Sequence, residues 1–369
     1  MRGRERLSIL FAALLLVACT DDAPPGLDAA ASDAAVLDTR AEAAPPADGA
    51  ADAPGAAELA QLVAFTRQEM AQRSVPGAAL AVVINGKLVH VRGLGLRKRG
   101  GTERVTADSL FSLASVSKPF TGALLMALVD EGKVKVTDSA AAMIPKLKFT
   151  DPTQGAKVTL HGLVSHTACA GHVEPGTLLA APGVDWSSTD SLVQAFEHIT
   201  WPLWCPPGAV WNYSNMGYSM AGAALQKKLG QPFHTLMDEQ IFTPAGMKRS
   251  TARASEAAAA GDQTFGHGSG APIPISNASL YFDAPNNGVV SSAREMGRFA
   301  EVLLAGGGKV LSKAAVASMS SAQADLSDRV TGQGYGYGLY RLPRDGVVVV
   351  SHSGTIFRSM KRFSSGRSS

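Results

Sequence analysis

The chain has 369 residues, of which 46% are hydrophobic and 18% are charged, so it is long enough to bury one large core or two modest ones. Its formal net charge of +3 is close to neutral for this length. The composition therefore indicates a globular protein and gives no sign of nucleic-acid binding.

The first 19 residues have the pattern of a secretion signal. Arginines come first, and the apolar run that follows at residues 7–17 is too short to span a bilayer comfortably. The sequence LVAC at residues 16–19 resembles a lipobox, in which Cys19 would be lipidated and become the first residue of the mature protein. We therefore expect an exported lipoprotein, held at a membrane through Cys19 and facing the periplasm or the cell exterior. The alternative is an ordinary signal peptide with an incidental cysteine.

Residues 20–56 consist mostly of Ala, Asp, Pro and Gly and contain almost no large apolar side chain. Such a segment cannot bury enough surface to offset the entropy lost on ordering. We expect a disordered tether that holds a folded domain, residues 57–356, away from the membrane.

The folded domain begins with a helix and a hairpin. Apolar residues at helical spacing predict a helix over residues 58–73. Two β-rich runs, residues 79–84 and 87–94, flank the dipeptide Asn85-Gly86. That dipeptide strongly indicates a tight turn, because both central positions of such a turn need positive φ.

The rest of the domain is mostly helical until the chain nears its end. A helical pattern begins at Ser115 and runs to Gly132. Further helices are expected at residues 216–229, 232–240, 293–305 and 313–319, and strands at residues 335–342 and 346–351. An early hairpin, a long helical stretch and late strands are typical of an α+β fold with segregated helices.

Ser115 and Lys118 form an S-x-x-K sequence at the start of the apolar helix. Residues three apart lie on one helix face, so the lysine amine can reach the serine hydroxyl. The helix N-terminus favours a developing alkoxide, and a poorly solvated lysine has a lowered pKa and can take the serine proton. By itself the motif is weak, because capped surface helices also produce it.

Two further motifs follow in order. Tyr213 and Asn215 belong to a Y-x-N triplet, and His352 and Gly354 belong to an H-x-G triplet near the end of the last predicted strand. The order S-x-x-K, Y-x-N, [K/H]-x-G resembles the class C β-lactamase and penicillin-binding-protein family. Other segments that resemble the family are LHGLVSHT at 160–167, PPG at 206–208 before YSNMGY at 213–218, IFTPAGM at 241–247, and NGVVSS at 287–292, with Asn287 in place of a glycine.

This resemblance implies a β-lactamase/transpeptidase-like fold, in which an antiparallel sheet with flanking helices is joined to a helical subdomain and the site lies between them. It implies that Ser115 attacks the substrate carbonyl, that Lys118 activates Ser115, and that Tyr213 passes protons to the leaving group. Asn215 would bind a substrate amide or steady Lys118. The backbone N–H groups of Ser115 and Thr355 would form the oxyanion hole.

His352 stands where β-lactamases of the family carry lysine. A histidine of ordinary pKa is mostly neutral at pH 7 and is a weaker anchor for a substrate carboxylate. His352 therefore suits an esterase or a peptidase at least as well as a β-lactamase. We expect Asn215, His352, Gly354 and Thr355 to contact a small-molecule or peptidoglycan-like substrate. No cofactor is expected, because acyl transfer needs only a nucleophile, a base and oxyanion donors.

The remaining cysteines and histidines leave alternatives open. Outside the cytoplasm, Cys169 and Cys205 could form a disulfide or remain two free thiols. His161, His166 and His172 fit no common zinc spacing, so we expect no metal. The resemblance of its segment implies that His166 orders a loop.

The end of the chain departs from the family. Relatives continue after the H-x-G with two more strands and a helix, whereas residues 357–369 are basic, serine-rich and without strand alternation. We expect that these C-terminal strands and the helix are missing, which would leave the site poorly supported. A truncated, catalytically inactive lipoprotein that keeps the motifs is therefore the alternative to an active enzyme.

Overall fold

The computed structural model describes residues 11–16, 55–171, 178–267, 271–275, 281–326, 332–344 and 347–355. Cys19 and His172 lie outside these ranges, as do most of the predicted tether and the atypical tail. The proposed boundaries of the signal and tether therefore stay predictions.

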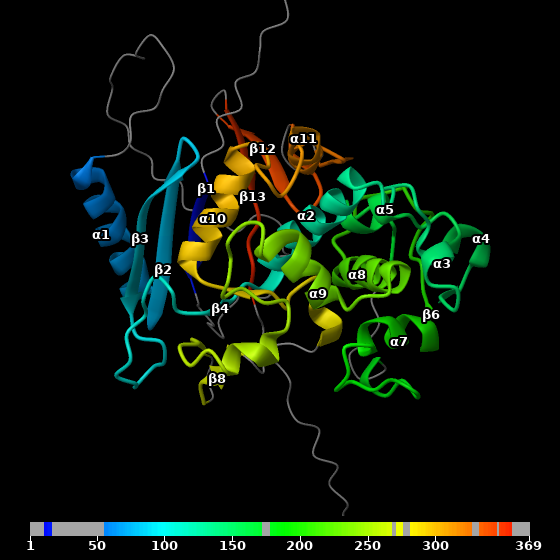
Figure 1. Cartoon of the computed structure of the whole chain (residues 1–369), viewed down its shortest axis with the longest axis horizontal. Helices are drawn as coiled ribbons and strands as arrows, with labels where there is room; N and C mark the ends of the chain where they lie inside the picture. The colour runs from blue at the N-terminus through cyan, green and yellow to red at the C-terminus, as the bar shows by residue number, and fades with distance from the viewer. Residues whose placement is uncertain are drawn as a thin grey trace, which may run out of the picture.

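The domain begins with a helix, α1 (Ala56–Gln72), and a hairpin formed by β2 (Gly77–Ile84) and β3 (Lys87–Gly95). Asn85 and Gly86 form the turn with φ of 51° and 72°, as the dipeptide predicted. Figure 1 shows α1 beside this hairpin, at the opposite end of the molecule from the helical part.

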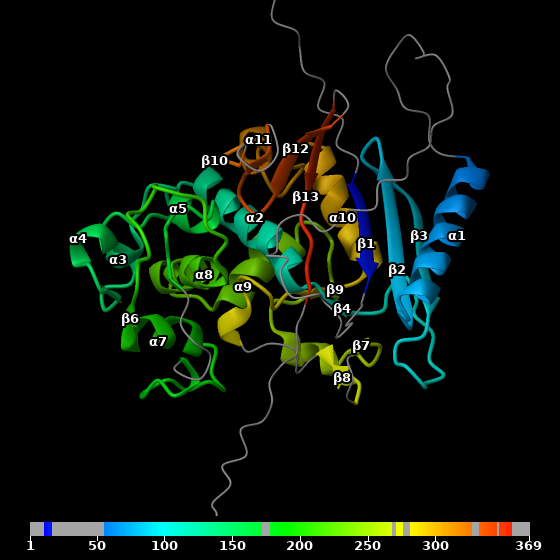
Figure 2. The same ribbon diagram turned by 180° about the vertical axis from the view of Figure 1, so that it is seen from behind.

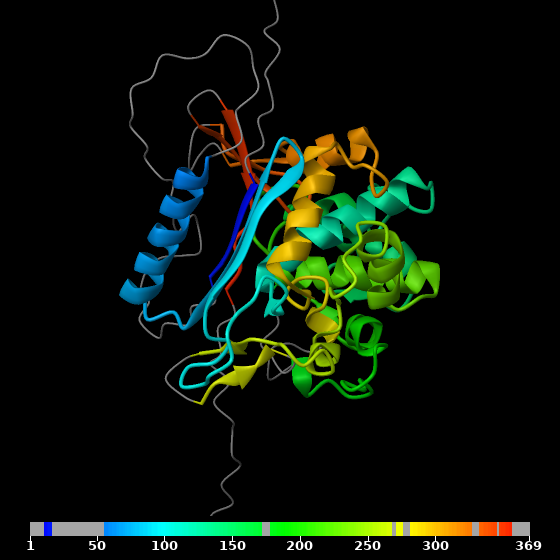
Figure 3. The ribbon, with the colours of Figure 1, turned by 60° about the vertical axis from the view of Figure 1, so that its left-hand side comes forward.

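The hairpin is covered by a helix on each face, which explains why β2 is apolar throughout. Leu80 packs with α1 on one face, whereas Ala79 packs with α10 (Ala293–Leu304) on the other. Gly297 lets α10 approach closely, because a Cβ there would lie 2.7 Å from the Leu88 side chain. Figure 3 shows the hairpin between the two helices.

The backbone of β1 (Phe11–Leu16) pairs antiparallel with β2. This strand lies on the side of β2 that faces β13, as Figure 2 shows. The segment falls within the predicted secretion signal, which this pairing does not test and which stays a prediction.

A second antiparallel sheet has the strand order β10-β11-β12-β13. Its strands are β10 (Ala324–Asp325), β11 (Gly334–Tyr335), β12 (Tyr340–Arg344) and β13 (Val347–Ser351). The prediction of one continuous strand over residues 335–342 is wrong. The chain turns at Gly338, whose φ of 85° is left-handed, and this turn separates β11 from β12.

The helical part is built around α2 (Ser117–Asp130), in which every residue from Ser117 to Leu128 is buried. A helix that is apolar on all sides needs neighbours all round. Those neighbours include α8 (Asn215–Leu229), α9 (Phe233–Met237) and α11 (Lys313–Ser320), and α5 (Leu160–Val164) packs against α8. Further out lie α3 (Ala140–Met143), α4 (Pro152–Gly155) and α7 (Ser191–His198).

The sequence predicts the ends of most of these helices correctly. Those expected at residues 216–229, 293–305 and 313–319 are α8, α10 and α11, whose bounds differ from the prediction by one residue at an end. The helix expected at residues 232–240 is only partly right, because α9 is short and continues as a π-turn, η2 (Asp238–Phe242).

Short strands and turns complete the fold. They are β4 (Phe111–Ser112), η1 (Ala114–Val116), β5 (Lys148–Phe149), β6 (Thr200–Trp201), η3 (Ala254–Ala258), β7 (Phe265–Gly266), β8 (Ile273–Pro274), η5 (Tyr281–Asp283) and β9 (Val290–Ser291). β4 pairs with β9 at the junction between hairpin and helices, directly before η1.

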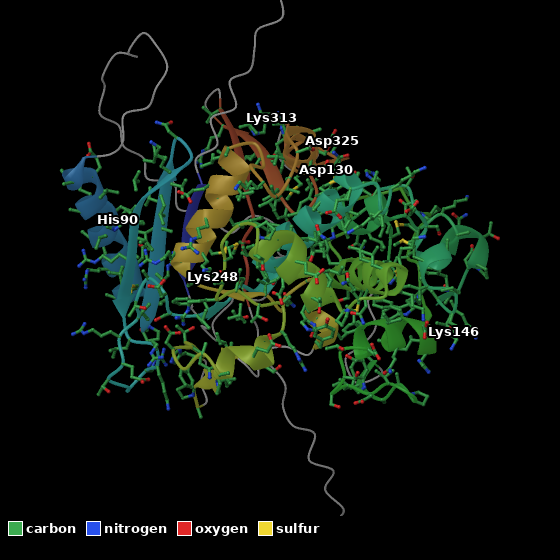
Figure 4. All side chains as sticks on the ribbon, viewed as in Figure 1. His90, Asp130, Lys146, Lys248, Lys313 and Asp325 are labelled. Atoms are coloured by element: carbon green, nitrogen blue, oxygen red, sulfur yellow. A yellow bond between two sulfur atoms is a disulfide. The ribbon has the colours of Figure 1, made fainter. Side chains whose placement is uncertain are left out.

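The far end of α2 is also fixed. Asp130 accepts hydrogen bonds from the backbone N–H and the hydroxyl of Ser312, both at 2.7 Å, directly before α11 begins. Figure 4 labels Asp130 and Lys313, the first residue of α11. In the part of the chain that the structure describes, no helix is long and apolar enough to cross a bilayer.

Candidate active site

Ser115 lies in the tight turn η1, between β4 and the first turn of α2. Ala114, directly before it, has a φ of 48°, in the left-handed region that alanine rarely adopts. On the other side, the Ser117 hydroxyl accepts the Val289 N–H at 2.9 Å, which joins the start of α2 to the strand pair β4-β9. The turn is therefore held from both sides, and Ser115 remains partly exposed.

Lys118 is completely buried and reaches three acceptors. Its amine lies 3.1 Å from the Ser115 Oγ, 2.7 Å from the Asn215 Oδ1 and 3.2 Å from the Asn286 carbonyl oxygen. Burial lowers the pKa of Lys118 well below its usual value, and the carboxylate of Asp283 only partly opposes that effect. A neutral amine keeps two donated bonds and can turn its lone pair toward the Ser115 hydroxyl.

Tyr213 lies across the site from Lys118. Its side chain hydrogen-bonds to Ser115, and its ring centre lies 4.7 Å from the Lys118 Nζ. Burial raises the pKa of Tyr213 well above its usual value, more than the Ser115 hydrogen bond lowers it. The phenol therefore stays protonated in the resting protein and is a hydrogen-bond donor at the nucleophile.

Asn215 is the first residue of α8, and its place is fixed by the preceding cap. The Ser214 hydroxyl accepts the Gly217 N–H at 3.0 Å, as a helix-capping serine does. Of the two contacts expected for Asn215, the structure shows the one with Lys118, in which the asparagine side-chain oxygen accepts from the amine.

Gly354 brings the end of β13 directly against the nucleophile turn. A Cβ on Gly354 would lie 2.4 Å from the Leu113 carbonyl oxygen and 3.0 Å from the Ser115 backbone nitrogen. Only glycine fits this approach. Thr355 is the next residue, so the backbone that follows Gly354 passes close to Ser115, and the oxyanion role of both N–H groups stays a prediction.

His352 lies just before this contact, among aromatic rings. Its ring centre is 5.5 Å from that of Tyr340, 6.1 Å from that of Tyr335 and 6.4 Å from that of Tyr213. Burial, together with the nearby Lys118, lowers the pKa of His352 to about 3. The imidazole is therefore neutral at pH 7 and carries no fixed positive charge into the site.

Two neighbouring residues contribute contacts that the sequence gave no reason to expect. The Asn286 carbonyl accepts from Lys118, and the Asn287 side-chain oxygen lies 3.4 Å from the Ser115 Oγ, which donates to it. A backbone carbonyl has no sequence signature. For Asn287, the sequence signal is that it replaces the glycine that the family carries at this position.

Cys169 and Cys205 form a disulfide, with their Cα atoms 5.4 Å apart. The bond joins the loop after α5 to the segment that leads to Tyr213. The two segments also pair through their backbones. The Trp204 N–H donates to the Cys169 carbonyl at 3.1 Å, and the Gly208 N–H donates to the Thr167 carbonyl at 2.7 Å.

His161 and His166, which the sequence analysis also named, have partners of their own. The His161 Nδ1 lies 2.9 Å from the Tyr337 hydroxyl, and the His166 Nδ1 accepts the Ser214 N–H at 3.0 Å. Within the described ranges, no three His, Cys, Asp or Glu side chains gather closely enough to hold a metal ion.

A cavity of about 460 Å³ adjoins the site behind Trp211, whose ring also contacts Tyr213. It is lined by Thr167, Gly208, Ala209, Val210, Trp211, Gln323, Ala324, Asp325 and Leu326. Asp325 is labelled in Figure 4. None of the lining residues is Ser115, Lys118 or Tyr213, so the cavity borders the acylation site and is not part of it.

Known proteins resemble this chain in sequence. Penicillin-binding protein 4 of Amycolatopsis lactamdurans is 31% identical over 296 residues, which cover 77% of this chain and 75% of that protein. The D-alanyl-D-alanine-carboxypeptidase/endopeptidase AmpH of Escherichia coli is 32% identical over 176 residues, 47% of this chain and 45% of the enzyme. The chain therefore spans three quarters of the first relative and less than half of the second.

The fold has solved counterparts as well. The octameric penicillin-binding protein homologue from Pyrococcus abyssi superimposes with a TM-score of 0.66 at 24% identity, over 81% of this chain and 68% of the other. This likeness shows the α+β, β-lactamase/transpeptidase-like fold. The family model described as "Beta-lactamase" matches residues 62–365, which is most of the chain. The chain thus belongs to the β-lactamase family and is a serine hydrolase of the class C-like type.

Proposed function

We propose that this chain is an exported hydrolase that forms an acyl-enzyme on Ser115 and acts on esters or amides whose scissile end carries no carboxylate. The observation that carries the proposal is the fully buried Lys118 amine, 3.1 Å from the Ser115 Oγ, with its pKa lowered by burial. A neutral amine at that distance is the base that a serine nucleophile needs.

The reaction follows from these contacts. The Ser115 oxygen attacks the substrate carbonyl carbon and its proton passes to Lys118, while backbone N–H groups stabilise the oxyanion. The bond to the leaving group then breaks, and that group takes a proton from Tyr213, which is refilled from Lys118. Water enters by the reverse route, adds to the acyl carbon and releases the acid and Ser115.

The substrate preference rests on His352. A β-lactam or a peptide ending in D-alanine presents a carboxylate, which a fixed cation would hold. His352 is neutral at pH 7, because burial lowers its pKa to about 3. Lys118 must itself be neutral to act as the base. We therefore expect the site to favour substrates with a neutral group at the position where a β-lactam or a peptide ending in D-alanine carries its carboxylate.

A peptidase or β-lactamase activity is the second candidate, supported by the names of the relatives that this chain resembles. A catalytically inactive protein that keeps the motifs is the third. The three candidates differ in whether Ser115 reacts and with which substrates.

The test begins with the purified chain from residue 20, incubated with a fluorophosphonate and separately with benzylpenicillin, beside Ser115→Ala. We expect a phosphonate adduct on Ser115 that the variant lacks. A matched pair of acyl-D-alanyl-D-lactate depsipeptides, in which the terminal carboxylate is either free or blocked as a methyl ester, then measures the preference at the ester bond between alanine and lactate. Faster turnover of the methyl ester supports the proposal, a preference for the carboxylate contradicts it, and a folded chain without any adduct indicates the inactive protein.

Export and anchoring form part of the same proposal. They rest on the basic and apolar start of the chain and on Cys19 in the sequence LVAC. Expression of the full chain and of Cys19→Ser in a bacterium tests them. We expect the first in the membrane fraction with a lipid adduct on its N-terminal cysteine, and the second without that adduct. An unprocessed N-terminus on the wild-type chain would contradict the anchor.

A further inference from the structure

Both backbone neighbours of Tyr213 hydrogen-bond to one residue, His166. The Asn212 N–H donates to the His166 carbonyl oxygen at 2.8 Å, and the Ser214 N–H donates to the His166 Nδ1 at 3.0 Å. The imidazole ring also lies against the Tyr213 ring, with centres 4.4 Å apart and planes inclined by 37°. One residue therefore fixes the backbone on each side of Tyr213 and one face of its ring.

His166 is itself held in place by its surroundings. It is 2% exposed, and its ring lies within 5.0 Å of Tyr218 and 4.7 Å of Tyr335. Its φ of 64° is left-handed, which a histidine keeps only where the surrounding structure determines it. The N–H of the next residue, Thr167, donates to the Gly162 carbonyl at 2.8 Å and fixes this turn at the end of α5.

The protonation of the ring follows from its contacts. Because Nδ1 accepts the Ser214 N–H, that nitrogen has no proton, and the neutral ring carries its hydrogen on Nε2. Nε2 is buried and has no hydrogen-bond partner among the described residues. Burial, with Lys118 and His352 nearby, lowers the pKa of His166 well below its usual value. The ring is thus a fixed neutral acceptor and does not carry protons in the reaction.

We propose that His166 is a positioning residue for Tyr213: by accepting the Ser214 N–H and packing on the phenol ring, it keeps the Tyr213 hydroxyl in line to protonate the leaving group. The inference rests on the proposed function, because it assigns His166 to the step in which Tyr213 gives up its proton. Earlier in the reaction, Lys118 and Ser115 act without His166.

The proposal predicts a dependence on the leaving group. Nitrophenolate leaves without a proton, whereas an alkoxide or an amine must receive one. His166→Phe keeps a ring against Tyr213 and removes the acceptor. A displacement of about 1 Å in a reacting group costs about 100-fold. We therefore expect His166→Phe to slow single-turnover acylation of Ser115 by an alkyl ester about 100-fold and by the matched p-nitrophenyl ester less than about threefold.

Asparagine provides the rescue control. The Oδ1 of asparagine can take the place of Nδ1 as acceptor of the Ser214 N–H, and asparagine tolerates left-handed φ well. We expect His166→Asn to recover at least about tenfold of the alkyl-ester rate that His166→Phe loses. Thermal unfolding of both variants, compared with the wild type, shows whether either one simply fails to fold.

A double variant separates positioning from general damage. Without the Tyr213 hydroxyl, its placement no longer matters, so His166→Phe should slow alkyl-ester acylation no further in a Tyr213→Phe background. Multiplied losses in the double variant, equal losses on both esters, or no rescue by asparagine would each overturn the role of His166. Fluorophosphonate labelling of Ser115 separates the two levels: a folded wild type that does not label overturns the proposed function together with this role, whereas normal labelling with the wrong variant pattern overturns only this role.

Discussion

The contact between Gly354 and the nucleophile turn can be tested by adding a single methyl group. In Gly354→Ala the new Cβ would lie 2.4 Å from the Leu113 carbonyl oxygen and 3.0 and 3.1 Å from the backbone nitrogens of Ser115 and Val116. All three are backbone atoms, so no side chain can turn aside. Relief of the contact needs a shift of about 1 Å between the two segments, because non-bonded heavy atoms approach to about 3.5 Å.

That shift separates the two backbone segments expected to supply the oxyanion donors. Loss of a single donor costs about 100- to 1,000-fold in rate, and a displacement of about 1 Å has a similar effect. We therefore expect Gly354→Ala to lower kcat/KM for an activated ester by about 100-fold. Gly354 is exposed and lies beyond the end of β13, so the melting temperature should change little.

Gly266→Ala is the matched control, because a Cβ there meets only the Ile273 carbonyl oxygen, at 3.9 Å. Both variants are assayed by steady-state kinetics and by differential scanning calorimetry. Full activity in Gly354→Ala would refute the reasoning, since it would mean that the H-x-G segment does not form a wall of the working site. Equal losses in both variants would attribute the effect to alanine in general and would refute it as well.

Three further predictions concern the charges around Ser115. Burial lowers the pKa of Lys118, and the amine is a neutral base above that pKa. The rate of Ser115 labelling should therefore rise as the pH passes the pKa of Lys118 and then level off. Lys118→Arg stays protonated, so its labelling rate in a time course should fall at least about 1,000-fold. His352→Lys introduces a cation in place of a neutral ring. We expect faster acylation by benzylpenicillin and a lower ratio of the methyl-ester rate to the carboxylate rate, both measured by mass spectrometry. An unchanged ratio would show that His352 does not determine substrate choice. When Lys118 is protonated it donates to the Ser115 hydroxyl, which in turn donates to the Asn287 side-chain oxygen. Asn287→Gly removes that acceptor and destabilises protonated Lys118, so the acid limb of the pH–rate profile should move to lower pH by about half a unit. An upward shift would contradict this assignment.

The elements that the sequence predicts well are those whose signals are local. Asn85-Gly86 requires two positive φ values, and the structure has a hairpin there. Ser292 and Ser312 accept backbone N–H groups at the starts of α10 and α11, which places both helices where their apolar spacing begins. The break at Gly338 was missed, because alternation alone does not show whether a glycine continues a strand or turns the chain.

The same distinction between local and distant sequence signals applies to the site residues. Ser115 and Lys118 are three residues apart on one turn, so their contact follows from helix geometry. Tyr213, Asn215 and His352 lie far along the chain, and only the resemblance to a family brought them into one site. The structure places these five residues together, although their roles stay predictions.

The contacts that remained hidden depend on tertiary packing. A backbone carbonyl such as that of Asn286 looks the same in any sequence, yet it accepts from Lys118 across a separation of 168 residues. The pattern suggested for His166 only an ordered loop, because its partners Asn212 and Ser214 are ordinary backbone N–H groups. Burial determines the charge of the site residues: it lowers the pKa of Lys118, keeps Tyr213 protonated and keeps His352 neutral. Burial depends on how α2, α8 and β13 pack together, so the motifs predict which groups meet and the fold determines their charge.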